Sequence, residues 1–235
     1  MHKTEKKALV LFSGGLDSSV CLALAVEAFG ADNVLALSVF YGQKHRRELQ
    51  AADEVAAHYG VRQIRLDLGE IFRGSDCSLL EGAREAIPHD DYAGQLQATA
   101  GQPVSTYVPF RNGLFLSSAA SVALSHGCSV IYYGVHADDA AGNAYPDTSR
   151  AFNEAISEAI RLGSGEQLTV KAPFVTLSKA DVVREGLRLH VPFEKTWSCY
   201  EGGDRACGVC GTCRDRRRAF ALNGVKDPMV YEGEA

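Results

Sequence analysis

The sequence of 235 residues contains no apolar run long enough to cross a bilayer, no internal repeat and no low-complexity segment. Near the N-terminus, an apolar stretch stops at Ser13 and is too short for a signal peptide or a membrane span. We therefore expect a cytoplasmic protein without a membrane partner. Positive charge is also in deficit, since the formal net charge is −5. This argues against nucleic acid as a partner, because broad nucleic-acid surfaces need clustered Lys and Arg.

Disulfides are not expected in the cytoplasm, although the chain contains seven cysteines. Four of them lie in the segment CYEGGDRACGVCGTC (199–213), where the last three are spaced C-x-x-C-x-x-C. Four thiolates so placed are typical of a closed, tetrahedral structural zinc site, which we call the zinc knuckle. An iron–sulfur cluster also takes four cysteines and stays an alternative. The predicted metal ligands are Cys199, Cys207, Cys210 and Cys213.

Strand-like and helix-like segments alternate along the chain, and the composition, with 46% hydrophobic residues, is that of a globular protein. The alternation predicts an α/β fold with a doubly wound, mostly parallel sheet and helices on both faces. The predicted strands are residues 8–12, 33–40, 62–68, 129–134 and 168–173. The predicted helices are residues 17–29, 45–60, 112–126, 149–162 and 178–190. Residues 69–106 are rich in Gly, Asp and Pro and are expected to be irregular.

The segment FSGGLDSSVCL (12–22) joins the first predicted strand to the first predicted helix. Its two glycines allow a tight turn with φ > 0, and the helix N-terminus supplies free N–H donors and a partial positive charge. These features predict a phosphate site at the carboxyl edge of the sheet. The segment lacks the lysine of the common mononucleotide loop and the spacing of the dinucleotide motif. A glycine turn that only caps a helix is the alternative.

SGGLDSS resembles the signature loop of the ATP-pyrophosphatase (PP-loop) superfamily. This resemblance implies a Rossmann-like fold of the adenine nucleotide alpha hydrolase type. It also implies a loop that binds the pyrophosphate end of ATP with Mg²⁺. Enzymes of this superfamily cleave ATP to AMP and pyrophosphate while they adenylate an oxygen of a second substrate. The implied ATP-binding residues are Phe12, Ser13, Gly14, Gly15, Leu16, Asp17, Ser18, Ser19, Val20, Cys21 and Leu22.

Two further segments at predicted loop positions are candidates for binding a second substrate. Tyr41 could stack on a planar base and Gln43 could pair with its edge. Arg111, which opens a predicted helix together with Asn112, could bind a carboxylate or phosphate through two parallel hydrogen bonds. Each of these residues could instead belong to a solvated loop.

Charged residues near the ends of other predicted elements complete the candidates. Asp138, Asp139 and Asp147 offer hard oxygen ligands of the kind that Mg²⁺ prefers. Lys179, at the start of a helix, could reach a leaving pyrophosphate. No histidine has a partner by spacing, so none is predicted to be catalytic. The basic run RDRRR (214–218) is interpreted as the solvated start of a helix.

The whole chain resembles the 7-cyano-7-deazaguanine synthase family, the nitrile-forming enzymes of queuosine biosynthesis. The resemblance implies a ligase that forms C–N bonds and uses ATP to join ammonia to 7-carboxy-7-deazaguanine. An acyl adenylate, an amide and finally the nitrile would form in turn. It also implies a homodimer with one structural zinc per subunit. The strings that carry it are FSGGLDSS (12–19), FYGQKHRRE (40–48), YVPFRNGLFLS (107–117), YGVHADDAAGNAYPD (133–147), WSCY (197–200) and CGVCGTC (207–213).

The resemblance and the loop positions together define the predicted site. The predicted catalytic residues are Ser13, Asp17, Arg111 and Lys179. The predicted substrate-binding residues are Tyr41, Gln43, Arg111, Asn112, Asp138 and Asp147. The chain departs from the family pattern at Val39 and Phe40, which precede YGQ, at Thr148, which follows YPD, and by the inserted NA of GNAYPD, which lengthens that loop.

We expect a PP-loop ATP-binding α/β domain over residues 1–195 and a zinc-binding lobe over residues 196–235. Two other functions fit part of the sequence. Another PP-loop enzyme, such as a tRNA thiolase or an amide-forming synthetase, would share SGGLDSS, but a thiolase should show a basic RNA surface and reactive cysteines. A non-enzymatic zinc-ribbon module would have no use for that loop.

Overall fold

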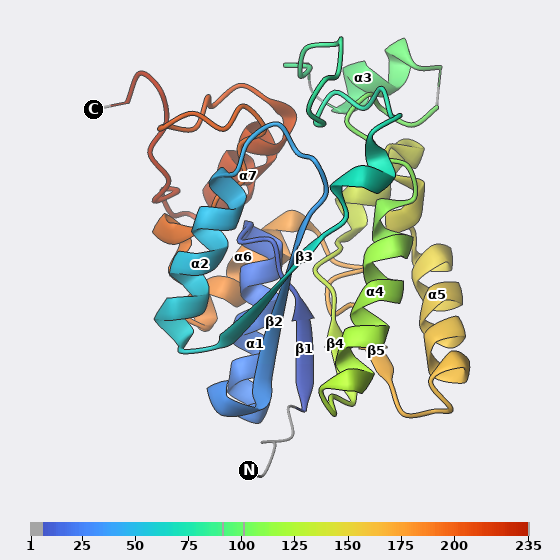
Figure 1. Cartoon of the computed structure of the whole chain (residues 1–235). Coiled ribbons are helices and arrows are strands. Elements are labelled where there is room, and N and C mark those ends of the chain that lie inside the picture. The colour runs from blue at the N-terminus through green and yellow to red at the C-terminus, as the bar shows by residue number, and fades with distance from the viewer. Residues whose placement is uncertain (1–6, 91, 101, 235) are drawn as a thin grey trace.

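A five-stranded parallel sheet forms the centre of the molecule, in the strand order β3–β2–β1–β4–β5 (Figure 1). The computed structural model describes residues 7–90, 92–100 and 102–234. The strands are β1 (Ala8–Leu11), β2 (Val34–Phe40), β3 (Arg62–Asp67), β4 (Val130–Tyr132) and β5 (Thr169–Lys171). The predicted fold class is confirmed. Continuous apolar runs form the central strands because both of their faces are covered.

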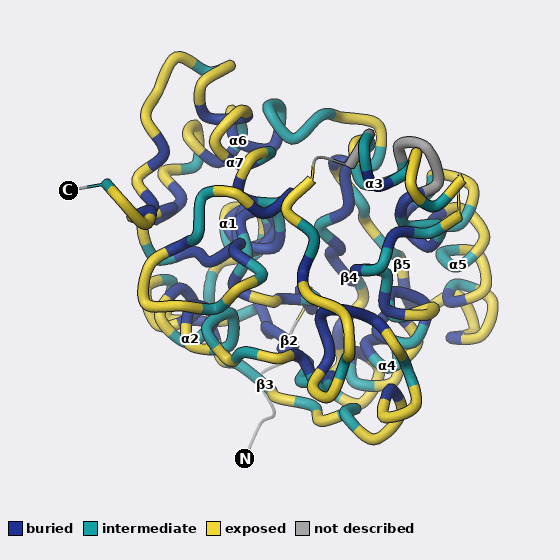
Figure 2. The backbone as a smooth tube through the Cα atoms, turned by 90° about the horizontal axis from the view of Figure 1, so that it is seen from above, coloured by how far each residue is buried: buried dark blue, intermediate teal, exposed yellow. Residues whose placement is uncertain are grey.

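Helices cover both faces of this sheet, so that buried backbone lies at the centre and exposed backbone around it (Figures 1 and 2). On one face, α4 and α5 pack over β1, β4 and β5. On the other, α1, α6 and α7 form a second buried cluster with parts of α2. The helices are α1 (Leu16–Phe29), α2 (Arg47–Tyr59), α3 (Tyr92–Ala98), α4 (Arg111–Ser125), α5 (Arg150–Gly163), α6 (Lys179–Arg188) and α7 (Gly211–Leu222).

All five predicted strands and all five predicted helices are present, with ends displaced by one or two residues. Local signals explain this agreement. Gly60 ends α2 in the left-handed conformation, and Ser178 with Asp181 forms a full capping box at the start of α6. Two helices were not fully predicted. The helix α3 lies within the segment that was expected to be irregular, and for α7 the sequence indicated only that a helix starts near RDRRR. Among the described residues, no helix is both long and apolar enough to cross a membrane.

The sheet reverses its winding direction between β1 and β4. The loop after β1 and the loop after β4 therefore diverge at the carboxyl edge of the sheet, which is where α/β proteins bind ligands. The two loops remain close at Gly134. A Cβ added there would lie only 3.0 Å from the backbone of Asp17 and Ser18. Glycine at this position lets the helix N-terminus and the β4 loop border the same space.

The C-terminal segment folds back onto the sheet rather than standing apart. Trp197, Cys199 and Tyr231 belong to the same buried cluster as Leu9 and Leu35 of the central strands. Residues 196–235 and the α/β part thus share a core. Their assignment to two domains, with residues 1–6 and 235 outside the described part, remains a prediction.

Arg216 anchors this segment from within, so the prediction that the whole run RDRRR is solvated is wrong at this residue. Its guanidinium is fully buried and binds both carboxylate oxygens of Asp227 at 2.8 and 3.0 Å. It also donates to the Thr196 hydroxyl at 2.7 Å and to the Phe193 carbonyl at 3.0 Å. Tyr231 donates to the same Asp227 carboxylate at 2.6 Å. Spacing on α7 places one arginine of the run inward, while Arg214, Arg217 and Arg218 stay exposed.

We predict that Arg216→Leu lowers the free energy of unfolding by about 3–5 kcal/mol, because Asp227 would remain buried without its cation. The matched variant Arg218→Leu, on the exposed face of the same helix, should change it by no more than about 0.5 kcal/mol. Denaturant unfolding of both variants measures the difference. Equal stabilities of the two variants would contradict the structural role of this ion pair.

Candidate active site

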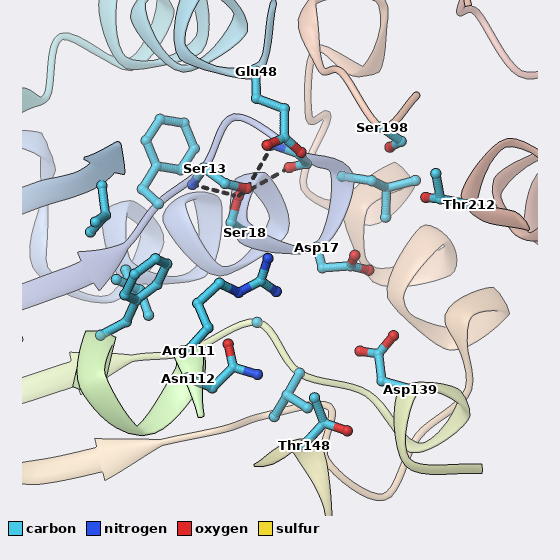
Figure 3. A pocket seen from close by; sticks show the side chains of 18 of the residues that line it. Ser13, Asp17, Ser18, Glu48, Arg111, Asn112, Asp139, Thr148, Ser198 and Thr212 are labelled. Atoms are coloured by element: carbon cyan, nitrogen blue, oxygen red, sulfur yellow. Dashed lines mark hydrogen bonds between the residues drawn. The ribbon is translucent and has the colours of Figure 1, made fainter. Parts of the chain in front are cut away.

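A cavity of about 240 Å³ opens at the carboxyl edge of the sheet (Figure 3). Its walls come from the loops after β1, β2 and β4, the first turns of α2, α4 and α6, and the C-terminal segment. Of the predicted ATP-binding residues, six line it, whereas Gly14, Ser19, Val20, Cys21 and Leu22 lie behind the wall. The six are Phe12, Ser13, Gly15, Leu16, Asp17 and Ser18.

Hydrogen bonds within the loop after β1 hold it in shape. The Ser13 N–H donates to the Ser18 hydroxyl at 3.2 Å, and the Gly15 N–H donates to the Ser13 hydroxyl at 3.2 Å. The Ser19 hydroxyl donates to the Gly15 carbonyl at 2.8 Å. The loop therefore leads into α1 with a fixed geometry, and the first N–H groups of the helix have no intrahelical acceptor. This arrangement provides anion-binding donors that are already ordered.

The two glycines of the loop have different roles. Gly14 has φ = 85°, and a Cβ there would lie 2.3 Å from the Ala52 nitrogen and 2.5 Å from the Glu48 carbonyl oxygen. Gly15 has φ = −75°, which any residue adopts, so the expectation of φ > 0 is wrong for it. A Cβ at Gly15 would meet the Ser13 hydroxyl at 3.1 Å, which is tight but adjustable. Only Gly14 is required by both backbone conformation and space.

Lys179, at the N-terminus of α6, reaches across to Asp17 and binds its carboxylate. His136, from the loop after β4, lies 3.3 Å from the Lys179 ammonium, 3.3 Å from Asp139 and 3.8 Å from Asp17. His136 is only 4% exposed. The sequence predicted Asp17 and Lys179 as site residues. The structure adds His136, for which the sequence analysis found no partner.

Charge keeps the Asp17 carboxylate ionised. Burial, the largest single cause, raises its pKa, but the charges of Lys179 and His136 and the hydrogen bonds that the carboxylate accepts together lower it more, so that the net pKa lies below its ordinary value. Its Oδ1 atom is buried and accepts no hydrogen bond from the described residues. An ionised oxygen that accepts no hydrogen bond, beside a loop of the phosphate-binding type, is suited to bind a cation.

Of the other three candidate aspartates, Asp138 and Asp147 do not line the cavity. Asp138 is exposed and accepts a hydrogen bond from the Lys179 backbone N–H at 2.8 Å, which fixes the start of α6. Asp147 is buried behind the wall and accepts from the Asn112 N–H at 2.8 Å. Asp139, the third candidate, lines the cavity, and so does Asp215, which was not predicted. Substrate binding by Asp138 and Asp147 stays a prediction, and their contacts give them roles in positioning α6 and α4.

Tyr41, Gln43, Arg111 and Asn112 all line the cavity, and their predicted role in substrate binding stays a prediction. The Arg111 guanidinium lies 5.2 Å from the centre of the Tyr41 ring and donates to the Tyr41 hydroxyl at 3.3 Å. The Gln43 side-chain oxygen accepts from the Tyr41 N–H at 2.9 Å. Tyr41 is thereby held by both neighbours, and the cation of Arg111 is presented to the cavity without a paired carboxylate among the described residues.

Glu48, in the first turn of α2, also lines this cavity and was not predicted as a site residue. Burial raises the pKa of its carboxyl to about 7, and the nearby charge of Arg111 offsets only part of that effect. No described side chain hydrogen-bonds to it. The sequence signal was weak, since a glutamate in the first helical turn ordinarily serves the helix dipole.

The four knuckle cysteines converge beside the cavity. Their sulfur atoms all lie within 4.8 Å of one another, and all four are free thiols. A tetrahedral zinc with Zn–S bonds of about 2.3 Å separates its sulfurs by about 3.8 Å, so the group is close to the size of a single-ion site. The Cys207 and Cys210 N–H groups donate to sulfurs at 3.3 Å, which stabilises thiolates. Between and beside these ligands, Thr212 and Asp215 line the cavity.

A model of the family described as queuosine biosynthesis protein QueC matches residues 7–224. The chain belongs to this family. It is 42% identical over 229 residues to the 7-cyano-7-deazaguanine synthase of Archaeoglobus fulgidus, covering 97% of this chain and 91% of that protein. It is 44% identical over 229 residues to the protein of the same name from Koribacter versatilis, covering 96% and 93%. An enzyme is therefore indicated, and the non-enzymatic zinc-ribbon alternative is not favoured.

Two solved structures share the fold at low sequence identity. NMN synthetase from Francisella tularensis superposes with a TM-score of 0.50 at 14% identity, covering 94% of this chain and 79% of that one. The U34-tRNA thiolase NcsA from Methanococcus maripaludis, solved with its [4Fe-4S] cluster, gives 0.51 at 16% identity, covering 94% and 68%. These similarities support the fold class and leave the chemistry to the residues of this chain.

We predict that Gly14→Ala weakens ATP binding by about tenfold or more, because the left-handed conformation and the clash with Ala52 cost at least about 1–2 kcal/mol. Gly15→Ala should have a smaller effect. Calorimetric titration with ATP measures both, and circular dichroism of each variant checks the fold. Equal affinities in the two variants would contradict the different roles of the glycines.

Proposed function

We propose that this chain is an ATP-dependent ligase that converts 7-carboxy-7-deazaguanine and ammonia to 7-cyano-7-deazaguanine, with release of AMP and pyrophosphate. The observation that carries the proposal is the ordered anion-binding loop with Lys179 beside it, in a chain of this family. The similar proteins from Archaeoglobus fulgidus and Koribacter versatilis are named for that activity, and the similarity covers nearly their whole length. The similarity to a thiolase lies in the fold alone, so a thiolase or an amide-forming synthetase is not favoured.

The chemistry explains why ATP is needed. A carboxylate becomes a nitrile through two losses of water, and oxide is a poor leaving group. Adenylation converts the oxygen into a phosphate ester that leaves as AMP. Ammonia then displaces the first AMP to give the amide, and a second adenylation, now of the amide oxygen, allows the nitrile to form. The protein contributes mainly positioning and charge stabilisation.

The loop and its neighbours would hold the triphosphate. The N–H groups at the start of α1 and the hydroxyls of Ser13 and Ser18 face the cavity, and Lys179 supplies a cation for the leaving pyrophosphate. Asp17 Oδ1 is the atom that fits Mg²⁺, because it is ionised, buried and without a hydrogen bond from the described residues. Mg²⁺ bound with ATP would neutralise phosphate charge.

Arg111 would hold the carboxylate of the deazapurine. It presents its cation to the cavity. The aromatic rings of Tyr41 and Phe115 pack against the guanidinium, with ring centres 5.2 and 5.9 Å from the guanidinium carbon. A bidentate pair of this kind orients the oxygen that must attack the α-phosphate of ATP. Tyr41, Gln43 and Asn112 would border the deazapurine ring.

The four cysteines would hold one structural zinc per subunit. The sulfur separations suit one ion better than a four-iron cluster, whose larger cube spreads its cysteine ligands farther apart. Thr212 and Asp215 belong to the same helix as Cys213, so the ion would also fix that wall of the cavity. We further propose a cytoplasmic homodimer as the working form.

With ATP, ammonia and 7-carboxy-7-deazaguanine, we expect AMP and pyrophosphate as products, and about two ATP consumed per nitrile, because each dehydration needs its own activated oxygen. Mass analysis should detect the primary amide as an intermediate. Asp17→Asn should lower the rate by about 10²-fold or more if the carboxylate positions the metal. Finding ADP as the nucleotide product, or neither amide nor nitrile, would refute the proposed function.

Elemental analysis should find about one zinc per chain, without sulfide-bound iron. Cys210→Ser should lose the metal and, with it, order in residues 196–235 and activity, whereas the α/β part should partly retain its helix signal. Cys128→Ala, away from the knuckle, should keep the metal. Full activity of a metal-free protein would show that the knuckle does not support the site.

A further inference from the structure

We propose that Glu48 forms the ammonium subsite of this enzyme and accepts the proton that ammonium must lose before it can attack. This inference rests on the proposed function. Glu48 is the second residue of α2 and lines the cavity, and Figure 3 shows its carboxylate directed toward the space above Ser13 and Ser18. An ion of one positive charge that enters this space meets a carboxylate with no competing hydrogen bond from the described residues.

The position of Glu48 is fixed by the packing of the loop. Gly14 lies against the first turn of α2 so closely that a Cβ would be 2.5 Å from the Glu48 carbonyl oxygen. Arg47, the preceding residue, lies over the Trp197 ring at 5.1 Å. The carboxylate is thus held next to the loop expected to bind the triphosphate, where the acyl adenylate would form.

Charged and titratable groups around Glu48 come from four parts of the chain. Against the larger effect of burial, the positive charge of Arg111 in α4 lowers the pKa of Glu48. Besides burial, the negative charge of Glu48 raises the pKa of Tyr41, the residue that follows β2. His45, just before α2, and Tyr200, from the C-terminal segment, line the same cavity. Arg111 does not form an ion pair with Glu48. Once the substrate carboxylate neutralises Arg111, Glu48 is left as an attractive site for a cation.

The partly enclosed position of Glu48 also makes its carboxylate basic enough to accept a proton from ammonium. Ammonia in neutral water is mostly ammonium, which has no lone pair with which to attack. A carboxyl of ordinary pKa is a weak proton acceptor at neutral pH. Burial raises the pKa of Glu48 to about 7, which matches the operating pH of a general base. Below that pH the carboxyl becomes protonated and can neither attract ammonium nor accept its proton.

The step balances as follows in atoms and charge. One N–H proton of ammonium passes to the Glu48 carboxylate, and the freed lone pair of nitrogen forms the C–N bond with the acyl carbon. The C–O bond to the phosphate breaks, and its electron pair leaves with AMP. The nitrogen then releases a second proton to water, which leaves the neutral amide. In the second half of the reaction the amide nitrogen loses both of its remaining protons as AMP leaves and the nitrile forms; adenylation of the amide oxygen makes these N–H groups strongly acidic, so water suffices as the acceptor there.

Glu48→Gln, which keeps the size of the side chain and removes its charge, tests the proposal in three assays. The first is pyrophosphate exchange with 7-carboxy-7-deazaguanine and no ammonia. The second is amide formation over a range of ammonium chloride concentrations. The third starts from the synthetic amide and follows nitrile formation, which bypasses ammonia. Glu54→Gln, an exposed glutamate on the same helix, is the matched control.

We expect kcat/KM for ammonium to fall by about 10²-fold in Glu48→Gln, while the first and third assays change by no more than about threefold. The pH profile adds a second signature. In the unaltered enzyme, kcat/KM for total ammonia should rise to pH of about 7 and then level off until ammonium itself titrates. In the variant it should keep rising, by about tenfold per pH unit, through pH 7 and up to the pKa of ammonium, because only free ammonia reacts.

Three outcomes would overturn the proposal. If KM for both deazapurines rises and the ammonium dependence is unchanged, Glu48 recognises the base. If pyrophosphate exchange is also lost, Glu48 supports the ATP site. If Glu48→Gln behaves like Glu54→Gln, Glu48 has no part in the reaction. An unaltered protein that forms no amide would instead refute the proposed function, so the two failures are distinguishable.

Discussion

The close approach of the Gly14 backbone to the first turn of α2 is the contact on which the geometry of the cavity depends. Gly14 touches the backbone of Glu48 and Ala52 on one side, and on the other its carbonyl accepts a hydrogen bond from the Trp197 N–H at 3.0 Å. One residue without a side chain thus joins the loop after β1, helix α2 and the C-terminal segment. A larger residue would separate these three walls, because neither backbone neighbour can move independently.

Charge is distributed around the cavity in two groups. Lys179, with Asp17 and His136, lies at the end where the loop and the N-terminus of α1 offer N–H donors. Arg111, with Glu48, lies toward the start of α4. Lys179 is paired with the Asp17 carboxylate, whereas Arg111 is held by the ring and hydroxyl of Tyr41 and forms no ion pair with Glu48, so both cations stay fixed in the free protein. Fixed charges of this kind need little reorganisation when charge develops during a reaction.

The C-terminal segment connects the proposed metal site to the same cavity. Buried Arg216 and Asp227 tie α7 to the segment around Thr196, while the cysteines hold the turn between Cys199 and α7. The residues that reach the cavity, Ser198, Thr212 and Asp215, lie between these two fixed points. A metal bound by these four cysteines would therefore act on the cavity by geometry alone.

Local sequence by itself determined the elements of the fold, the loop after β1 and the four cysteines. These depend on neighbours in the chain: apolar runs, helix caps, adjacent glycines and a cysteine spacing of three residues. The predicted site residues Ser13, Asp17, Tyr41, Gln43, Arg111, Asn112 and Lys179 line one cavity because parallel strands bring their carboxyl ends to one edge.

Only the tertiary structure decided which polar residues face that cavity. Besides its neighbour Asp139, His136 meets Asp17 of α1 and Lys179 of α6, which lie 119 and 43 residues away in the chain, so sequence spacing could not reveal these two contacts. Asp147 and Arg216 look like surface residues in sequence but are buried against partners on other elements. The conformation of Gly15 and the burial of Glu48 depend in the same way on how the loop and α2 pack. Sequence patterns report local periodicity, whereas burial and charge pairing arise only when distant segments meet.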